Sequence, residues 1–149
     1  AGISDSGGLP SAGGKGLARI DTSTLKLTAL GDFSGNLQGR GAELTGTGDG
    51  KLYGFFTTTP ADLAEITKAS GATATPVELT GVDTGLAWAF SFWGGDFWFY
   101  TSSGIAASKV TRYKASGDKS ISVVVNDVGS FTIVGAGVST CAPTAPPVK

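Results

Sequence analysis

Short apolar runs of strand length recur along the whole chain and are separated by polar turns. Residues 25–30 (Leu-Lys-Leu-Thr-Ala-Leu) alternate apolar and polar side chains, as expected for a strand with one buried face. Residues 52–56 and 97–100 are aromatic runs and residues 121–125 are rich in β-branched side chains, and both compositions favour a pleated sheet. Helix signals are nearly absent, so the pattern predicts an all-β fold.

This strand pattern repeats with a period of roughly 46 residues. Leu17–Ile20, Leu63–Ile66 and Val110–Tyr113 each open a stretch in which a polar turn, a second β-like run and a glycine-rich segment follow. Aromatic hairpins complete the first two stretches, with tight turns predicted at Gly48-Asp49-Gly50 and Gly94-Gly95-Asp96. Four short antiparallel strands per repeat of this length are typical of a β-propeller blade.

The second repeat shows the expected unit most clearly. Its four strands are predicted at residues 63–67, 75–79, 86–92 and 97–101. Pro60 and the three-residue spacing of Leu63 and Ile66 also suit a helix, but the matching positions of the other repeats read as strand, so we predict a strand here. In the third repeat, residues 131–134 and 135–139 are expected to begin the later strands before a proline-rich tail ends it.

Two segments of the first repeat resemble the degenerate blades of bacterial exported β-propeller proteins. They are residues 17–24 (Leu-Ala-Arg-Ile-Asp-Thr-Ser-Thr) and residues 50–54 (Gly-Lys-Leu-Tyr-Gly). The resemblance extends over most of residues 17–140 and implies a propeller-like architecture. Such blades occur in binding proteins, scaffolds, lyases and hydrolases, so the resemblance implies a fold rather than an activity.

The domain organisation expected from these patterns is an incomplete propeller. Its blades are residues 17–62, 63–109 and 110–141, preceded by residues 1–16 as an extension or closing strand and followed by residues 142–149 as a proline-rich tail. Propellers close with about 4 to 8 blades, so about three blades leave two apolar end faces uncovered. We therefore expect the chain to form a homo-oligomer or to bind the missing part of a propeller. A closed β-sandwich is the alternative fold.

Charge and composition exclude several classes of partner. The net charge is −1, from 11 basic and 12 acidic residues, and no run of like charges exceeds two, which argues against nucleic acid and anionic membranes. No apolar run approaches the ~18 residues of a membrane span. The chain begins at Ala1, contains no Met and is only 15% charged, so we expect a leading segment to have been removed and the protein to be secreted, periplasmic or on the cell surface.

The chain lacks most side chains that carry catalysis. It has no His and one Cys, which excludes Ser-His-Asp and Cys-His nucleophiles, imidazole zinc sites and Cys-rich metal sites. The carboxylates in or near loops are Asp32, Glu43, Asp49, Asp83, Asp96 and Asp127. No two of them have a spacing typical of a catalytic pair. Asp49 and Asp96 adjoin turn glycines, where an Asp side chain commonly caps its own turn. We assign no catalytic residue and no cofactor; calcium stays an alternative, although an Asp-x-Asp-x-Asp loop is absent.

Five residues are candidates for binding. Trp93 and Trp98 flank the Gly94-Gly95 turn within an aromatic cluster that otherwise reads as core, and there they could stack on sugar rings or grip a protein partner. Arg40 and Glu43 flank the start of an expected inner strand and could meet a ligand in a channel; a salt bridge or simple solvation is the alternative. Cys141 is a candidate for an intermolecular disulfide or a small half-buried residue at a strand end.

These observations favour a non-enzymatic exported module that binds a macromolecule or assembles with itself. One alternative is a carboxylate-based propeller enzyme, a lyase or glycosidase, which needs two acidic groups within about 5–10 Å of each other. The other is a structural subunit whose uncovered ends pair into a filament.

Overall fold

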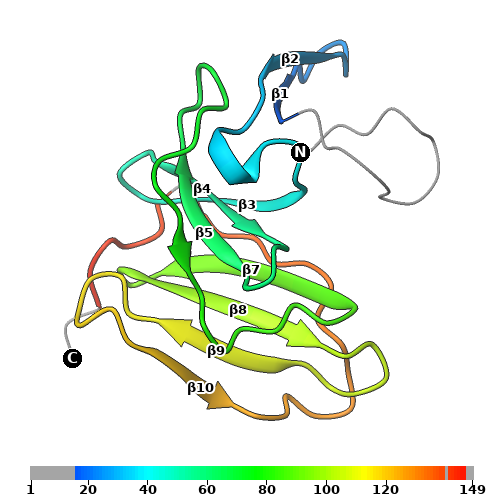
Figure 1. The fold of residues 1–149 in the computed structure, drawn as a ribbon, viewed down its shortest axis with the longest axis vertical. Coiled ribbons are helices and arrows are strands. Elements are labelled where there is room, and N and C mark those ends of the chain that lie inside the picture. The colour runs from blue at the N-terminus through cyan, green and yellow to red at the C-terminus, as the bar shows by residue number, and fades with distance from the viewer. Residues whose placement is uncertain (1–15, 140, 147–149) are drawn as a thin grey trace.

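The computed structural model describes residues 16–139 and 141–146, and their regular structure is almost wholly β (Figure 1). A two-stranded sheet contains β1 (Leu17–Ile20) and β2 (Leu27–Gly31), and a single 3-10 turn, η1 (Gly35–Leu37), follows it. The middle sheet contains β3 (Ala42–Gly46), β4 (Leu52–Phe56), β5 (Asp62–Ile66) and β6 (Val77–Glu78). The last sheet contains β7 (Ala87–Trp93), β8 (Asp96–Ser102), β9 (Lys109–Tyr113) and β10 (Ile121–Val125). The predictions of an all-β chain and of four-stranded antiparallel sheets are confirmed.

Each four-stranded sheet is a meander in which strands adjacent in sequence pair antiparallel. The predicted strands at residues 52–56 and 121–125 coincide with β4 and β10, and the two predicted hairpin turns join β3 to β4 and β7 to β8. Gly94 and Gly95 both have positive φ, 65° and 84°, the conformation that a tight two-residue hairpin turn requires. The second predicted repeat, residues 63–109, spans parts of both four-stranded sheets.

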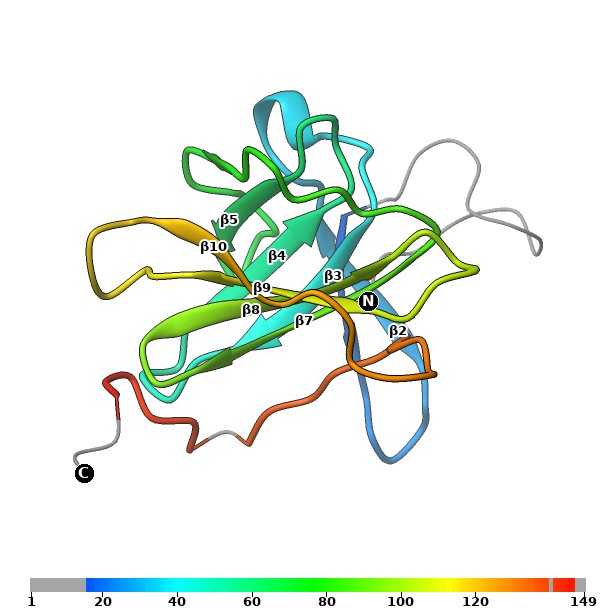
Figure 2. The ribbon, with the colours of Figure 1, turned by 90° about the horizontal axis from the view of Figure 1, so that it is seen from below.

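One hydrophobic core lies between the middle sheet and the last sheet. Phe55 of β4 packs against Phe90 and Phe99 of the last sheet, with ring centroids 5.8 Å and 4.8 Å away. Near the edge of this contact, the ring of Tyr53 meets that of Phe97 at 4.8 Å. Figure 1 shows the last sheet below the middle sheet, and in the view from below their strands cross (Figure 2).

A second core lies on the opposite face of the middle sheet. Phe56 and Ile66 pack there with Leu17 of β1, Phe33 and Leu37. The rings of Phe33 and Phe56 meet edge to face at 5.0 Å. Because neighbouring strand residues point to opposite faces, Phe55 and Phe56 enter different cores, and the middle sheet is buried on both sides.

Three connections are closed by similar backbone hydrogen bonds. In the turns after β1 and β5, the N–H of Leu25 and of Gly71 donates to the C=O four residues earlier, and in the turn after β9 the N–H of Lys119 donates to the C=O of Lys114, five residues earlier. The donor residue has positive φ in each turn, 56°, 78° and 62°. Glycine adopts this conformation freely, whereas Leu25 and Lys119 adopt it at a steric cost. The predicted strand at residues 25–30 accordingly begins only at Leu27.

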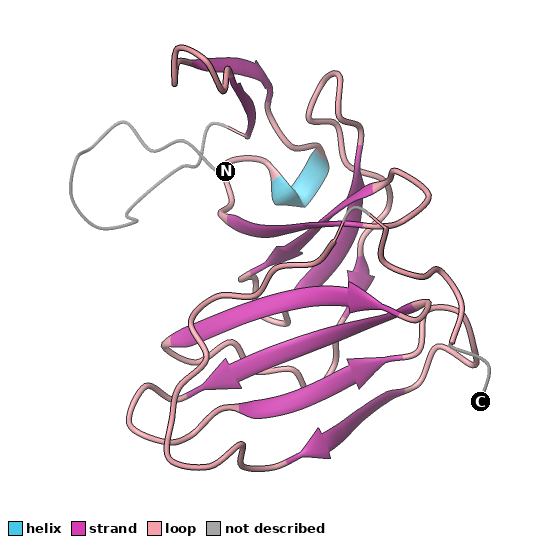
Figure 3. Ribbon diagram, turned by 180° about the vertical axis from the view of Figure 1, so that it is seen from behind, coloured by secondary structure: helices cyan, strands magenta, loops and turns pink. Residues whose placement is uncertain are grey.

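The strands expected at residues 131–134 and 135–139 are wrong, because these residues are irregular. A strand needs a neighbouring backbone ladder, and here the polar groups bond to the loop before β9 instead. The N–H of Ser108 donates to the C=O of Phe131 (3.2 Å), and the N–H of Ile133 donates to Ser108 Oγ (2.8 Å). We call residues 126–139 the return segment, because it turns back after β10 and passes beside the last sheet (Figure 3); near its end, Val138 packs against the core between the two larger sheets.

The expectation of an N-terminal extension or closing strand falls almost wholly on residues 1–15, which lie outside the described residues, as do residues 147–149 of the proline-rich tail. The described part of the tail is held against the fold: Ala142 is buried, and the N–H of Gly95 donates to the C=O of Pro143 at 3.3 Å. Within the part of the chain that the structure describes, no helix has the length and apolar character that crossing a membrane requires.

Candidate functional site

The last sheet has an outer face, which points away from the middle sheet. Phe97 and Phe99 of β8 point into the core, so the residues that alternate with them, Asp96, Trp98 and Tyr100, point outward. The strand register places Arg112 of β9 directly opposite Trp98 on this face. The outer face therefore combines aromatic rings with two opposite charges.

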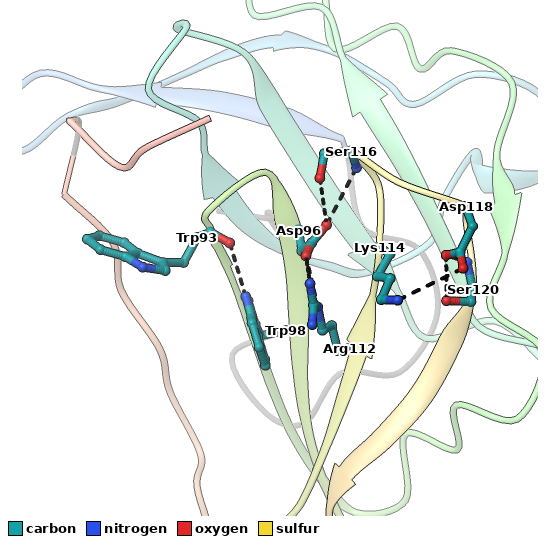
Figure 4. Close-up of polar contacts among 8 residues, drawn as sticks. All are labelled: Trp93, Asp96, Trp98, Arg112, Lys114, Ser116, Asp118 and Ser120. Atoms are coloured by element: carbon teal, nitrogen blue, oxygen red, sulfur yellow. Dashed lines mark hydrogen bonds and ion pairs between the residues drawn. The ribbon is translucent and has the colours of Figure 1, made fainter. Parts of the chain in front are cut away.

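Asp96 and Arg112 form an ion pair at the end of β8 (Figure 4). Asp96 Oδ2 accepts from Arg112 Nη2 at 2.5 Å and from Nε at 2.8 Å, and its side chain is only 2% exposed. The other carboxylate oxygen accepts from Ser116 Oγ at 3.1 Å. The guanidinium carbon lies 5.4 Å from the centre of the Trp98 ring, within the range of a cation–π interaction.

The two tryptophans predicted as binding residues lie together on this face. The indole N–H of Trp98 donates to the C=O of Trp93 at 3.2 Å, as Figure 4 shows. Trp98 is half-buried, whereas the side chain of Trp93, beside the turn, is 49% exposed. The aromatic cluster thus divides between core and surface: Phe90 and Phe99 are buried, and the tryptophans remain in contact with solvent.

The return segment covers part of the outer face. Ala89 of β7, which points outward, is fully buried, and so is Ser108, which bonds to the return segment. The part formed by β9 and β10 is more open: Arg112 is half-buried, Ser122 is exposed and Val125 is 40% exposed. The uncovered part of the outer face therefore lies toward β10, the edge strand.

The middle sheet has a counterpart to this face, and it is covered. Tyr53 of β4 stands opposite Glu65 of β5, as Trp98 stands opposite Arg112. Lys51 lies two residues before Tyr53 and pairs with Glu65 at 3.1 Å. Asp96 lies two residues before Trp98 and is therefore the counterpart of Lys51. The two pairs thus occupy matching positions with their charges exchanged.

The surroundings of these counterparts differ. The hydrogen bond to Glu65 raises the pKa of Lys51, and burial, helped by the negative charge of Glu65, raises the pKa of Tyr53. Tyr53 contacts Phe97 of the last sheet, so the face that it belongs to is covered by another sheet. Trp98 has no sheet against it in the part of the chain that the structure describes.

Asp96 corrects one expectation. Its carboxylate was expected to cap its own turn, but it binds Arg112 and Ser116 on the neighbouring strand and its turn. Asp49 does bond locally, accepting from the hydroxyl of Thr47. Other loop carboxylates also bond within their loops: backbone N–H groups of Phe33, Gly85 and Gly129 donate to Asp32, Asp83 and Asp127 at 2.8, 3.0 and 2.7 Å.

Arg40 lines a polar pocket of about 410 Å³ between the η1 loop and the β4–β5 loop. The register pairs Asp62 with Glu78 on its wall, and Thr58 donates to Asp62 at 2.9 Å. Asn36, Thr57, Thr59 and Pro60 complete the lining. Hydroxyl, amide and charged groups of both signs suit a small polar ligand rather than an apolar one.

Glu43, the second of the two charges predicted to meet a ligand, does not line this pocket. It is half-buried on β3, opposite Phe55, and burial raises the pKa of its carboxyl. The structure therefore does not bring Arg40 and Glu43 into one site. No cluster of three or more metal-ligating side chains occurs within residues 16–139 and 141–146.

Cys141 is exposed, and its N–H donates to Ser139 Oγ at 3.1 Å. Its neighbour Ala142 is buried against the core between the two larger sheets, near the β3–β4 turn. The thiol therefore sits on the surface of an anchored segment, where another thiol can reach it.

Arg112 is the site residue that sequence reasoning missed. A signal was present: in Asp96-Phe97-Trp98-Phe99-Tyr100, the two phenylalanines alternate with the residues that form the outer face. This alternation does not show which strand pairs with residues 96–102, so it does not identify Arg112. Comparisons with protein-family models, with curated proteins and with solved structures found no match.

Proposed function

We propose that this chain is a non-enzymatic exported module that completes a propeller by binding a further sheet on the outer face of β7–β10. One observation carries the proposal: among residues 16–139 and 141–146, no sheet covers the face of Trp98 and Arg112, whereas their counterparts Tyr53 and Glu65 lie on a covered face. A sheet face that carries large rings gains stability when it is removed from water.

The layered arrangement supports a propeller-like assembly rather than a closed sandwich. Both four-stranded sheets are meanders, and the middle sheet is packed on both faces. The similar turns after β1, β5 and β9, each closed by the N–H of a residue with positive φ, support three related units. The first unit has only the β1–β2 hairpin among the described residues, so the series ends at both sides without a complete neighbour.

The partner is a second copy of this chain or a separate chain that supplies the missing blades. The low charge of the chain suits an exported protein, and the absence of His and of paired catalytic spacing supports a binding role over a lyase or glycosidase. A filament is the outcome if the same contact repeats without closing.

Solution mass against protein concentration tests the proposal. We expect a mass that is a multiple of the 14.9 kDa chain and is unchanged by reductant. A Cys141→Ser variant should show the same mass, which separates association of sheets from disulfide pairing. A chain that stays monomeric at every concentration, alone and with reductant, would contradict self-assembly; a partner would then have to be sought among other chains.

Trp93 favours glycan binding as a second candidate function. Its ring is 49% exposed beside a rigid two-glycine turn, and an exposed ring at such a site can stack on a sugar. A glycan array probed with the native chain and with Trp93→Ala tests it. We expect binding that the variant loses, whereas equal signals from both proteins would exclude a role for Trp93.

A further inference from the structure

We infer that the outer face of β7–β10 is covered by the β1–β2 hairpin of a second copy of this chain, in a head-to-tail contact. This inference rests on the proposed function and names its partner. It starts from two exposed surfaces at opposite ends of the layered structure, and from the covered contact between the middle and last sheets.

The first surface is on the hairpin. Ile20 stands opposite Leu27 in the β1–β2 ladder, and the two side chains are 52% and 54% exposed. Ile20 is the last residue of β1, and the last residues of β5 and β9 are Ile66 and Tyr113. Ile66 is 2% exposed and Tyr113 is 6% exposed. Each of those two packs against the layer that precedes it, so Ile20 is the member of this set without a preceding layer among the described residues.

The second surface is the open part of the outer face. In the observed contact, Tyr113 of β9 and its ladder partner Ile121 of β10 pack onto the core that faces Tyr53 and Phe55 of the middle sheet. Ile20 and Leu27 are the counterparts of Tyr113 and Ile121. The covering surface that Trp98 and Tyr100 lack is therefore present on the same chain, at its other end.

The sizes of the two surfaces also agree. The hairpin has only two strands, and it matches the outer two strands of a four-stranded sheet. The return segment already covers the part of the outer face near β7, where Ala89 is fully buried. What remains open lies toward β9 and β10, so two strands from a second copy fit where four would collide with the return segment.

The charges on the outer face tolerate burial by such a hairpin. Arg112 satisfies Asp96 with two hydrogen bonds, and Ser116 satisfies the second carboxylate oxygen. A covering layer would therefore bury the remaining exposed part of a paired ion rather than an isolated charge, and the pairing offsets part of the desolvation cost. The apolar side chains of Ile20 and Leu27 bring no charge of their own.

Cross-linking between two tagged variants tests the contact. In a Cys141→Ser background, Leu27→Cys goes into one chain and Ser122→Cys, on the outer face, into the other, and a short bifunctional maleimide is added. We expect a cross-linked pair in the mixture but not from either variant alone. Ile105→Cys, in a loop where the side chain is 99% exposed, replaces Ser122→Cys as a control and should give no pair.

A second variant measures the energetic role of the hairpin. Ile20→Lys should weaken self-association at least tenfold, whereas Leu25→Lys, in the exposed turn of the same hairpin, should leave it unchanged. Circular dichroism of both variants checks that the sheets are intact. Loss of association in both variants or in neither would overturn the inference.

The outcomes separate this inference from the proposed function. An assembled chain in which Leu27→Cys cross-links with itself, or in which the mixture gives no pair, overturns the head-to-tail contact and leaves assembly standing. A chain that never associates overturns the contact between copies and leaves a separate chain as the partner in the proposed function. A mass that keeps growing with concentration, together with pairs in the mixture, supports the contact and shows that it does not close into a ring.

Discussion

Arg112 closes over Asp96 with two hydrogen bonds to one carboxylate oxygen, although the residues come from different strands and lie 16 positions apart. Lys51 and Glu65 form the matching pair on the middle sheet, 14 positions apart and with the charges exchanged. The two pairs differ in burial: the side chains of Lys51 and Glu65 are 48% and 42% exposed, whereas that of Asp96 is 2% exposed. This difference allows the energetic role of one pair to be measured against the other.

Removal of Arg112 should destabilise the protein substantially. In Arg112→Ala the Asp96 carboxylate stays buried without its cation, and breaking such a pair costs about 3–5 kcal/mol when both partners are buried. Because the Arg112 side chain is 31% exposed, we expect a smaller loss, about 2–3 kcal/mol, in urea unfolding. Lys51→Ala is the matched control and should cost clearly less, because water screens the exposed Lys51–Glu65 pair. Equal losses in the two variants would mean that the burial of Asp96 does not decide its energetic role.

Leu25→Gly should stabilise the protein. Leu25 adopts a left-handed conformation that costs a side-chain-bearing residue about 1–2 kcal/mol, and glycine relieves this cost while losing about 0.5–1 kcal/mol through greater freedom in the unfolded chain. The expected net gain is about 0.5–1 kcal/mol in the free energy of unfolding. Lys119→Gly should behave in the same way.

The reverse change at the matching position serves as the control. A Cβ added at Gly71 would lie 2.4 Å from the carbonyl oxygen of Gly31, so Gly71→Ala should destabilise by about 1–3 kcal/mol. If Leu25→Gly lowered the free energy of unfolding, the left-handed conformation of Leu25 would not be a source of strain.

Glu43→Gln should change how stability depends on pH. Burial raises the pKa of Glu43 in the folded protein above its ordinary value of 4.5, so the folded state binds this proton more tightly than the unfolded state does. The contribution is therefore complete below the ordinary pKa and is lost as pH rises through the raised value. Relative to the native chain, the glutamine variant should gain stability between pH 4 and pH 7. Urea unfolding of both proteins at matched concentration measures this difference, and a difference independent of pH would contradict it.

Phe99→Ala should test the core between the two larger sheets. Phe99 is fully buried and stacks near both Phe55 and Phe90, and removing such a ring costs about 3–5 kcal/mol. Phe131, in the return segment, is 58% exposed, so Phe131→Ala should change the free energy of unfolding by no more than about 0.5 kcal/mol. A large loss from Phe131→Ala would show that the return segment contributes to the fold as strongly as the core does.

The sequence by itself determined where most of the strands and the two aromatic hairpin turns lie. Alternation of apolar and polar side chains and the placement of turn glycines are local signals, and they located β4, β10 and both aromatic hairpins. They also placed Trp93 and Trp98 beside the Gly94-Gly95 turn as candidates for binding. Leu25 adopts positive φ although it is an apolar residue of strand-like sequence, so the alternation placed the start of that strand two residues too early.

Only the tertiary structure decided what each face of a strand meets. Phe99 is buried and Trp98 is partly exposed because a second sheet packs against one face of β8 and not against the other. Arg112 lies beside Asp96 because β8 pairs with β9. Residues 131–139 carry strand-like sequence, but they lack a backbone ladder to join and remain irregular. The reason is that hydrogen bonds and contacts between strands join residues distant in sequence, so the local pattern specifies the strand but not its neighbours.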